Sequence, residues 1–260
     1  MEVIYISEKK AKIIAVAGKG GVGKTTLAAA MIRRLVENKP ESRILAIDAD
    51  PAVGLATCLG VDVKLTLDDI RRVIIENVEE GRTREAMELV EESRFRVFDA
   101  LVEQEGYAFL AIGRPEAEGC YCRINAYLKD VITMVSGEFD YVVIDSEAGI
   151  EQINRRVLEK VTHLLLVSDQ SRKGIQVAAT IKQVADELVM YDRIGAAINR
   201  ATNPELNQYL SIPGVDILAY IGTDEHHAAN DIQGKTVFSL PPESPVYRGA
   251  GEILEKFGIL

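Results

Sequence analysis

Short apolar runs alternate with longer stretches of helical periodicity along the chain. The runs that predict strands are rich in β-branched residues and cover residues 12–17, 43–47, 141–144, 164–167, 194–198 and 217–221. Helical patterns are clearest at residues 25–36, 174–189 and 245–257. A continuous apolar run, in place of strict alternation, indicates a strand buried on both faces, as in parallel sheets. The pattern therefore predicts an α/β fold, a doubly wound and mostly parallel sheet with helices on both faces.

Two regions give a weaker pattern. Residues 65–93 are charged and helical, and residues 95–112 predict one or two further strands. A length of 260 residues allows one large domain or two small ones. Because no repeat, linker or low-complexity tract interrupts the pattern, we expect residues 1–260 to form a single domain.

The composition narrows the class of protein. Hydrophobic residues make up 47% and charged residues 27%, which is typical of a folded globular chain. The net charge of -10 disfavours general binding to nucleic acid or anionic lipid, so we expect neither as a partner. No apolar run approaches the roughly 20 residues of a membrane helix. Three cysteines and a start without a signal-peptide pattern predict a cytoplasmic protein.

A glycine-rich loop lies between the first predicted strand and the first predicted helix. Residues 18–25, GKGGVGKT, match the pattern G-x-x-x-x-G-K-[ST] of a phosphate-binding loop. Glycines let backbone N–H groups turn toward phosphate oxygens at the start of a helix. Lys24 is expected to neutralise the β- and γ-phosphates, and the Thr25 hydroxyl to bind Mg²⁺. The residues expected to contact ATP or ADP are Gly20, Gly21, Val22, Gly23, Lys24, Thr25 and Thr26.

A second lysine in this loop points to one class of ATPase. With Lys19 the loop reads KGGVGKT, which resembles the deviant Walker A family of MinD, ParA, the nitrogenase iron protein and arsenite-transport ATPases. The resemblance implies a P-loop ATPase that forms a homodimer around the nucleotide. It also implies that Lys19 reaches the phosphates bound by the partner subunit. The alternative is a surface lysine beside the loop.

Aspartates follow two of the predicted strands. The segment Asp48-Ala49-Asp50-Pro51 resembles the family's switch I, which implies that Asp50 orients the attacking water and that Asp48 lies near the metal. Asp145 ends another strand and begins a D-x-x-x-G pattern that closes at Gly149. We expect Asp145 to hold Mg²⁺ together with Thr25, and Gly149 to approach the γ-phosphate. An isolated aspartate is more often a helix cap or a turn residue, but these two positions follow a phosphate loop.

Two further residues are expected near the base. Asn199 follows the strand predicted at residues 194–198, where the family commonly reads adenine with an asparagine amide. The amide can donate and accept at once, although an Asx turn at a strand end is the alternative. Pro241 lies in a late loop that the family often packs against the base. The chain has no N-K-x-D guanine motif, so ATP is favoured over GTP.

A cysteine pair separates this chain from most of those relatives. In an extended segment Cys120 and Cys122 would point to the same side, so both thiolates could bind one soft metal ion such as Zn. Two thiolates are half of a tetrahedral site, and a second copy across a two-fold axis would complete four ligands. Polar flanking residues such as Glu118 and Arg123 indicate a loop. Redox chemistry, or two buried cysteines without a ligand, are the alternatives.

Taken together, the motifs resemble the nickel-insertion accessory ATPases of carbon monoxide dehydrogenase, the CooC type. Only the cysteine pair, Arg123, Asn125 and the run Ala148-Gly149-Ile150-Glu151 favour this branch, because the P-loop and switches are shared by all relatives. The resemblance implies metal at the dimer interface and nickel delivery to carbon monoxide dehydrogenase. A sister branch serves acetyl-CoA synthase. The chain departs from the pattern at Ser146-Glu147, where an acidic residue stands in switch II.

Two other functions remain open at this stage. A positioning ATPase of the MinD or ParA type would act on membrane or DNA, against which stands the acidic net charge. An electron-transfer ATPase like the nitrogenase iron protein would hold a cluster between subunits. In that pattern the two cysteines are far apart in sequence, whereas here they are two residues apart.

Overall fold

The computed structural model describes residues 11–80, 96–113, 130, 132–146 and 160–260. The strands are β1 (Lys12–Gly18), β2 (Ile44–Ala49), β3 (Val102–Gln104), β4 (Tyr107–Ala111), β5 (Tyr141–Ser146), β6 (Lys160–Ser168), β7 (Met190–Asn199) and β8 (Asp216–Ile221). The α-helices are α1 (Lys24–Asn38), α2 (Gly54–Leu59), α3 (Leu67–Glu79), α6 (Arg172–Leu188), α7 (Glu225–Ile232) and α8 (Pro245–Lys256). Short 3₁₀ helices are η2 (Pro204–Tyr209) and η3 (Val237–Ser239).

The strands form a single sheet in the order β3-β4-β2-β5-β1-β6-β7-β8 within the described ranges. β3 pairs antiparallel with β4, and the other pairings between these strands are parallel. The predicted doubly wound, mostly parallel sheet is therefore confirmed. The weak pattern at residues 95–112 contains β3 and β4, the two strands at one edge.

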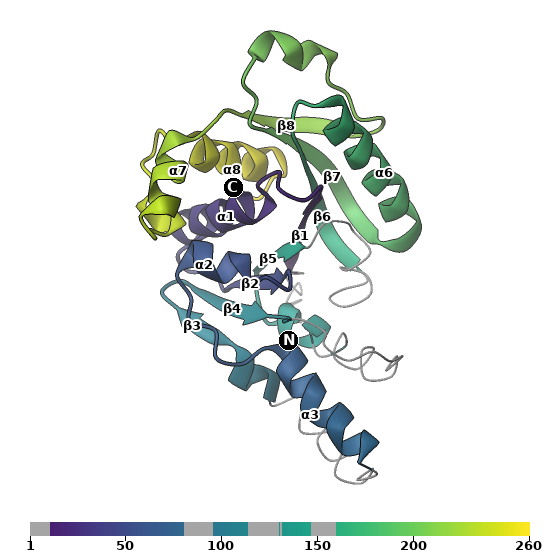
Figure 1. Ribbon diagram of the computed structural model, residues 1–260, viewed down its shortest axis with the longest axis vertical. Coiled ribbons are helices and arrows are strands. Elements are labelled where there is room, and N and C mark those ends of the chain that lie inside the picture. Colours follow the sequence, from purple (N-terminus) through teal and green to yellow (C-terminus); the bar gives the residue numbers. More distant parts are fainter. Residues whose placement is uncertain (1–10, 81–95, 114–129, 131, 147–159) are drawn as a thin grey trace, which may run out of the picture.

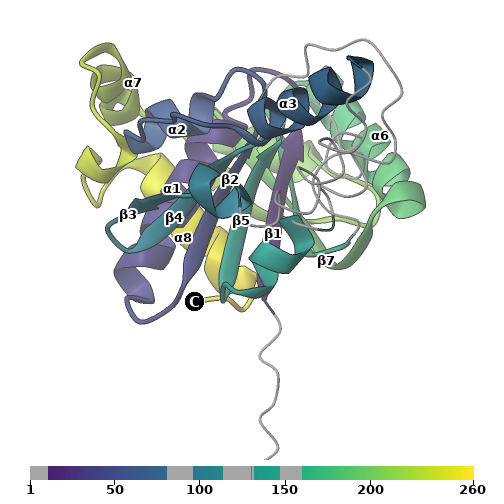
Figure 2. The same ribbon diagram turned by 90° about the horizontal axis from the view of Figure 1, so that it is seen from below.

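Helices cover both faces of the sheet, as Figure 1 and Figure 2 show. Along β1, Ile14 and Val16 belong to the core that packs against α1 and α8, whereas Ala15 and Ala17 belong to the core beneath α3 and α6. Successive side chains of a strand point to opposite faces, so a strand covered on both sides must be apolar throughout. This is why the central strands read as unbroken apolar runs.

Two strands begin earlier than their apolar runs. β6 starts at Lys160 and β7 at Met190, four residues before the predicted starts, and the two residues are register partners. An ion pair of 3.7 Å between Lys160 and Asp192 accompanies this pairing. In β7 backbone hydrogen bonding thus extends the strand past the buried region, whereas in β6 only Lys160 is exposed and Val161, Thr162 and His163 are buried. α3 occupies the first half of the predicted helical stretch at residues 65–93, and residues 81–95 lie outside the described part.

The parallel strands bring their carboxyl ends to one edge of the sheet. β1 lies between β5 and β6. The next strand in the chain, β2, lies on the β5 side of β1, whereas β6, β7 and β8 lie on the other side, so the direction of the strand order reverses here. Crevices at such a point are where open α/β sheets bind ligands. The loops after β1, β2, β6 and β7 reach this edge, and Asp145 lies near the same end of β5, so the fold brings together several segments in which the sequence predicts nucleotide chemistry.

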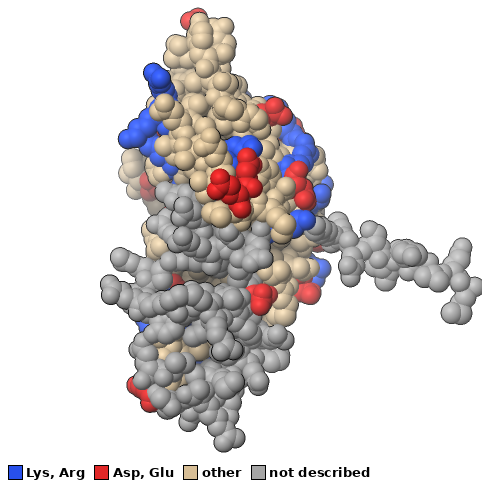
Figure 3. Space-filling model, turned by 90° about the vertical axis from the view of Figure 1, so that its right-hand side faces the viewer, with Lys and Arg blue, Asp and Glu red and all other residues tan. Residues whose placement is uncertain are grey.

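Charges of both signs lie on the face of the molecule that carries α6 (Figure 3). Acidic and basic side chains stand next to one another on this face. On α6, Lys182 and Asp186 form an ion pair. Among the described residues, no helix combines the length and apolar character that crossing a membrane requires.

Candidate nucleotide-binding site

The glycine-rich loop connects β1 to α1 and is closely packed by its neighbours. A Cβ atom on Gly18 would lie 2.2 Å from the Val167 carbonyl oxygen of β6, so only glycine fits there. Gly23 has a φ of 91°, and a Cβ atom on it would lie 2.4 Å from the Asn199 side-chain nitrogen. Both glycines are therefore required by the backbone path, which leaves the loop at the start of α1 as a phosphate-binding loop demands.

Lys24 lies over this loop. Its side chain is buried, and its Nζ donates a hydrogen bond of 3.3 Å to the carbonyl oxygen of Lys19. The ammonium group is thus held on the loop side of α1, at the positive end of that helix. A cation in this place is suited to neutralising phosphate oxygens.

Asp145 is the most unusual polar group of the site. It ends β5 next to β1, its residue is 0% exposed, and neither carboxylate oxygen has a hydrogen-bond partner among the described residues. Burial raises the pKa of Asp145 to about 7, although the nearby Thr25 hydroxyl and Lys24 act in the opposite direction. A buried carboxylate without partners destabilises the fold unless a cation, or a water molecule bound to a cation, contacts its oxygens. Asp145 and Thr25 therefore supply oxygen ligands of the kind that Mg²⁺ prefers.

Asp48 lies near the end of β2, Asp50 directly follows the strand, and both make local contacts. The Asp48 carboxylate accepts hydrogen bonds from the backbone N–H groups of Asp50 at 3.1 Å, Leu55 at 2.9 Å and Ala56 at 3.3 Å. Asp48 thereby caps the start of α2, while burial raises its pKa to about 6. Asp50 accepts a bond of 2.9 Å from the Ala52 N–H in the same turn. The structure shows the cap and turn contacts of both residues, and their roles near metal and water stay predictions.

Lys19 pairs with an aspartate that the sequence analysis missed. Its Nζ lies 3.8 Å from Oδ2 of Asp169, and its side chain is 36% exposed. Asp169 directly follows β6 and also accepts hydrogen bonds from the N–H and hydroxyl groups of Ser171. Partial burial opposes ionisation, but the Ser171 bonds and Lys19 outweigh it and lower the pKa of Asp169. Its position after a strand at the nucleotide edge was the available signal.

Asn199 lies against the loop at the end of β7. Its side-chain nitrogen donates a hydrogen bond of 2.7 Å to the Val22 carbonyl oxygen, and its side-chain oxygen accepts one of 3.0 Å from the Arg200 N–H. The predicted adenine contact is not tested by this arrangement, which shows instead that the amide supports the phosphate loop.

The structure describes Pro241 but not Gly149 or the two cysteines of the predicted metal site. Pro241 is partly buried in the loop after η3, and Arg33 fixes that loop by donating to the carbonyl oxygens of Val237 and Leu240 at 2.9 and 2.6 Å. Gly149, Cys120 and Cys122 lie outside the described residues. Within the described part of the chain, no three His, Cys, Asp or Glu side chains gather in a way that could hold a metal ion.

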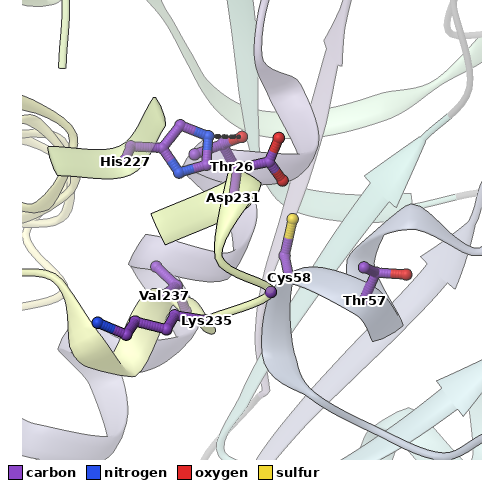
Figure 4. A pocket seen from close by; sticks show the side chains of 8 residues that line it. Thr26, Thr57, Cys58, His227, Asp231, Lys235 and Val237 are labelled. Carbon is purple, nitrogen blue, oxygen red and sulfur yellow. Dashed lines mark hydrogen bonds between the residues drawn. The ribbon is translucent and has the colours of Figure 1, made fainter. Parts of the chain in front are cut away.

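A second residue that sequence reasoning missed is His227. The adjacent pair His226 and His227 predicts two surface positions on a helix, and only His226 is exposed. His227 is half-buried, and its Nε2 lies 3.1 Å from the Thr26 hydroxyl in a hydrogen bond between residues 201 positions apart (Figure 4). Its place shortly after β8, another strand that ends at the nucleotide edge, was the available signal.

His227 also lines a small pocket beside the start of α1. The pocket has a volume of about 60 Å³ and is lined by Thr26, Thr57, Cys58, His227, Asp231, Gly234, Lys235 and Val237. Cys58, for which the sequence predicts a core position, is half-buried: it packs against the core and also reaches this pocket. Burial raises the pKa of the Cys58 thiol to about 11.

These features together have the chemistry that binding of a metal-bound polyphosphate requires. Loop amides, the start of α1 and Lys24 supply positive potential, and Thr25 and Asp145 supply oxygen ligands for a cation. Lys24 and Thr25 begin α1 after the loop that follows β1, and Asp145 lies near the carboxyl end of the neighbouring strand β5.

Comparison with known proteins agrees with this geometry. A family model described as an AAA domain matches residues 11–192. An ATP-binding protein of Methanocaldococcus jannaschii is 36% identical over 249 residues, which cover 94% of this chain and 97% of that protein. The carbon monoxide dehydrogenase accessory protein CooC of Rhodospirillum rubrum is 28% identical over 242 residues, which cover 88% of this chain and 90% of CooC.

The fold also matches a solved structure. The MinD cell division protein of Aquifex aeolicus superimposes with a TM-score of 0.67 at 20% identity, covering 95% of this chain and 97% of that one. The predicted resemblance to the MinD and ParA group is therefore confirmed at the level of the fold. With the AAA domain model covering more than half of its residues, the chain belongs to the AAA domain family and has the MinD-type P-loop fold.

Proposed function

We propose that the chain is a Mg²⁺-dependent ATPase that converts ATP and water to ADP and phosphate. The observation that carries this proposal is the buried Asp145 carboxylate, which has no hydrogen-bond partner among the described residues and lies beside the phosphate loop. A magnesium ion with its bound water would satisfy both oxygens and lower the pKa of the group. The ATP-binding relative of M. jannaschii supports the same nucleotide.

Each residue has a part in this reaction. Phosphoryl transfer depends on positioning and on charge stabilisation more than on covalent chemistry. The loop amides and Lys24 hold the phosphates and neutralise charge as it moves to the leaving group. Asp50 orients the attacking water, and Asn199 keeps the loop in place through the Val22 carbonyl oxygen. When bound, Mg²⁺ acts as a Lewis acid on the phosphate oxygens.

The active species of the proposal is a homodimer. Lys19 lies at the exposed rim of the loop and is held by Asp169 rather than directed into its own site. A second copy facing the loop would allow Lys19 to reach the partner's phosphates, where an additional cation stabilises the developing charge.

The cargo of the proposed reaction is a soft metal. Cys120 and Cys122 of two copies would complete a four-thiolate site for Zn or Ni. The spacing of the cysteines and the likeness to CooC, a carbon monoxide dehydrogenase accessory protein, support delivery of nickel to a nickel enzyme. That enzyme would be carbon monoxide dehydrogenase or acetyl-CoA synthase, and the ATPase would act in the cytoplasm.

Elemental analysis of the purified chain, combined with light scattering with and without ATP, tests the proposal. We expect about one Zn or Ni ion per two chains, bound when ATP produces the dimer. Iron and sulfide in stoichiometric amounts would support electron transfer instead. A dimer that holds no metal would favour a positioning ATPase.

The three cysteines provide matched variants. Replacing Cys120 and Cys122 by serine should remove the metal and the metal-dependent dimer, whereas Cys58→Ser should keep the metal of the parent protein. If the double variant binds metal and dimerises like the parent, the interfacial site is wrong.

A further inference from the structure

The start of α1 is joined to α7 by one side-chain contact. The Thr26 hydroxyl and the His227 ring nitrogen Nε2 are 3.1 Å apart. Thr26 follows Lys24 and Thr25 directly, so its hydroxyl belongs to the first turn of the helix that faces the phosphates. The contact therefore lies at the nucleotide site and not merely on a distant surface.

Few buried contacts hold α7 against the rest of the fold. None of its residues is buried, and Ile232 near its end is 87% exposed. Asp224 caps the helix by accepting from the His227 N–H at 2.9 Å, and it also binds the Ser244 hydroxyl and the Val246 N–H at the start of α8. The backbone of His227 is thus fixed to the C-terminal part of the fold, and its ring provides the contact with the phosphate-loop helix.

The pocket beside this contact leaves the ring room to adjust. It is lined by residues of α7 and α2, which stand side by side in both ribbon views (Figure 4), and its volume has room for only a few water molecules. This volume is too small for a nucleotide base, so the pocket does not itself bind one. Its polar walls, Thr57, Asp231 and Lys235, allow water to surround the ring.

A threonine hydroxyl has one hydrogen to donate and can accept at the same time. If its hydrogen is directed at a phosphate oxygen, the neighbouring Nε2 must be the donor in the 3.1 Å contact. We propose that His227 is a positioning residue for the nucleotide: its Nε2–H donates to the Thr26 hydroxyl, which donates in turn to a phosphate oxygen. Hydrogen bonds in such a chain polarise and strengthen one another.

The inference rests on the proposed nucleotide site and adds a residue outside every motif of that site. Isothermal titration of the full chain with ADP in the presence of Mg²⁺ tests it. We expect His227→Ala to weaken ADP binding roughly fivefold, which corresponds to one hydrogen bond. His227→Gln should restore most of the affinity, because the amide nitrogen of glutamine can donate from a similar position.

Two comparisons separate this role from a structural one. His226→Ala, on the same helix but exposed, should bind ADP like the parent. In the Thr26→Val background, His227→Ala should cause no further loss of affinity, because the hydroxyl through which it acts is gone.

The outcomes are distinct. If the parent protein does not bind ADP, the proposed ATPase function is wrong. If the parent binds ADP and His227→Ala binds it equally well, the role of His227 is wrong. Lower stability of His227→Ala without nucleotide, together with unchanged ADP affinity, would show a structural role only and would also overturn the inference.

Discussion

Asp48 and Asp145 are register partners on the neighbouring parallel strands β2 and β5, so two buried carboxylates stand side by side at the nucleotide edge. Burial raises the pKa of Asp48 to about 6 and that of Asp145 to about 7, and the charge of Asp48 also raises the pKa of Asp145. The two differ in their contacts, because three backbone N–H groups bind Asp48 and none of the described groups binds Asp145. The site thus holds a carboxylate that favours a cation or a proton.

This arrangement predicts that the protein without nucleotide loses stability as the pH rises. A carboxyl whose folded pKa lies above its unfolded value of 3.8 stabilises the fold below about pH 4, and this contribution is lost as pH rises through the folded pKa. For Asp145 the difference corresponds to roughly 4 kcal/mol at most. The free energy of unfolding of Asp145→Asn should therefore exceed that of the parent by about 1–3 kcal/mol at pH 8. The gain is smaller than the full difference because burying the asparagine amide without hydrogen-bond partners is itself unfavourable.

Urea unfolding at pH 5 and pH 8, without Mg²⁺ and nucleotide, measures this difference. The gain should be much smaller at pH 5, and Asp145→Asn should have lost ATP hydrolysis despite its greater stability. Asp216→Asn changes an exposed carboxylate of β8 and serves as the control. An equal effect of Asp145→Asn at both pH values would contradict the account.

The Lys19–Asp169 pair predicts a change in dimerisation. Because the pair is partly exposed, its strength is at most about 1 kcal/mol. Asp169→Asn should free Lys19 for the partner's phosphates and lower the dimer dissociation constant in ATP by up to roughly fivefold. Sedimentation of the variant in ATP measures this constant. Asp186→Asn, which removes an ion pair at the other end of α6, should have no effect, and weaker dimerisation of Asp169→Asn would disprove the release of Lys19.

Replacing Asn199 should lower the affinity for nucleotides by a factor that does not depend on the base. Its amide nitrogen binds the Val22 carbonyl oxygen, so Asn199→Ala should loosen the phosphate loop for every nucleotide. We expect affinities for ADP and GDP to fall by a similar factor of roughly five to ten. Competition binding against both nucleotides is the measurement. A selective loss for ADP would instead show the adenine contact that the sequence predicts.

The fold could be predicted from the sequence because the central strands are buried on both faces. Apolar runs such as residues 12–17 leave little choice of element, and the glycine loop that follows fixes the position of α1. The antiparallel edge strand β3 lies within residues 95–112, where the sequence predicts one or two strands only weakly, because Glu103 and Gln104 are exposed and carry no apolar pattern. The early start of β7 rests on backbone pairing of mostly exposed residues, which leaves no apolar pattern. In β6 the buried polar residues Thr162 and His163 interrupt the apolar run.

The site was predictable where motif residues end parallel strands. Lys24, Thr25 and Asp145 meet because their strands share one carboxyl edge. Asp169 and His227 belong to no motif, and their contacts with Lys19 and Thr26 arise only from the packing of distant segments. Such long-range contacts leave no local periodicity in the sequence.

The most direct measurement of the central claim is Mg²⁺-dependent ATP hydrolysis by the parent protein, Lys24→Ala and Lys12→Ala. Lys12 is an exposed residue at the opposite end of β1, which makes it a matched control for the loss of a lysine. The account predicts hydrolysis by the parent and by Lys12→Ala, and a loss of at least about a hundredfold for Lys24→Ala. Turnover by Lys24→Ala at the rate of the parent would contradict it.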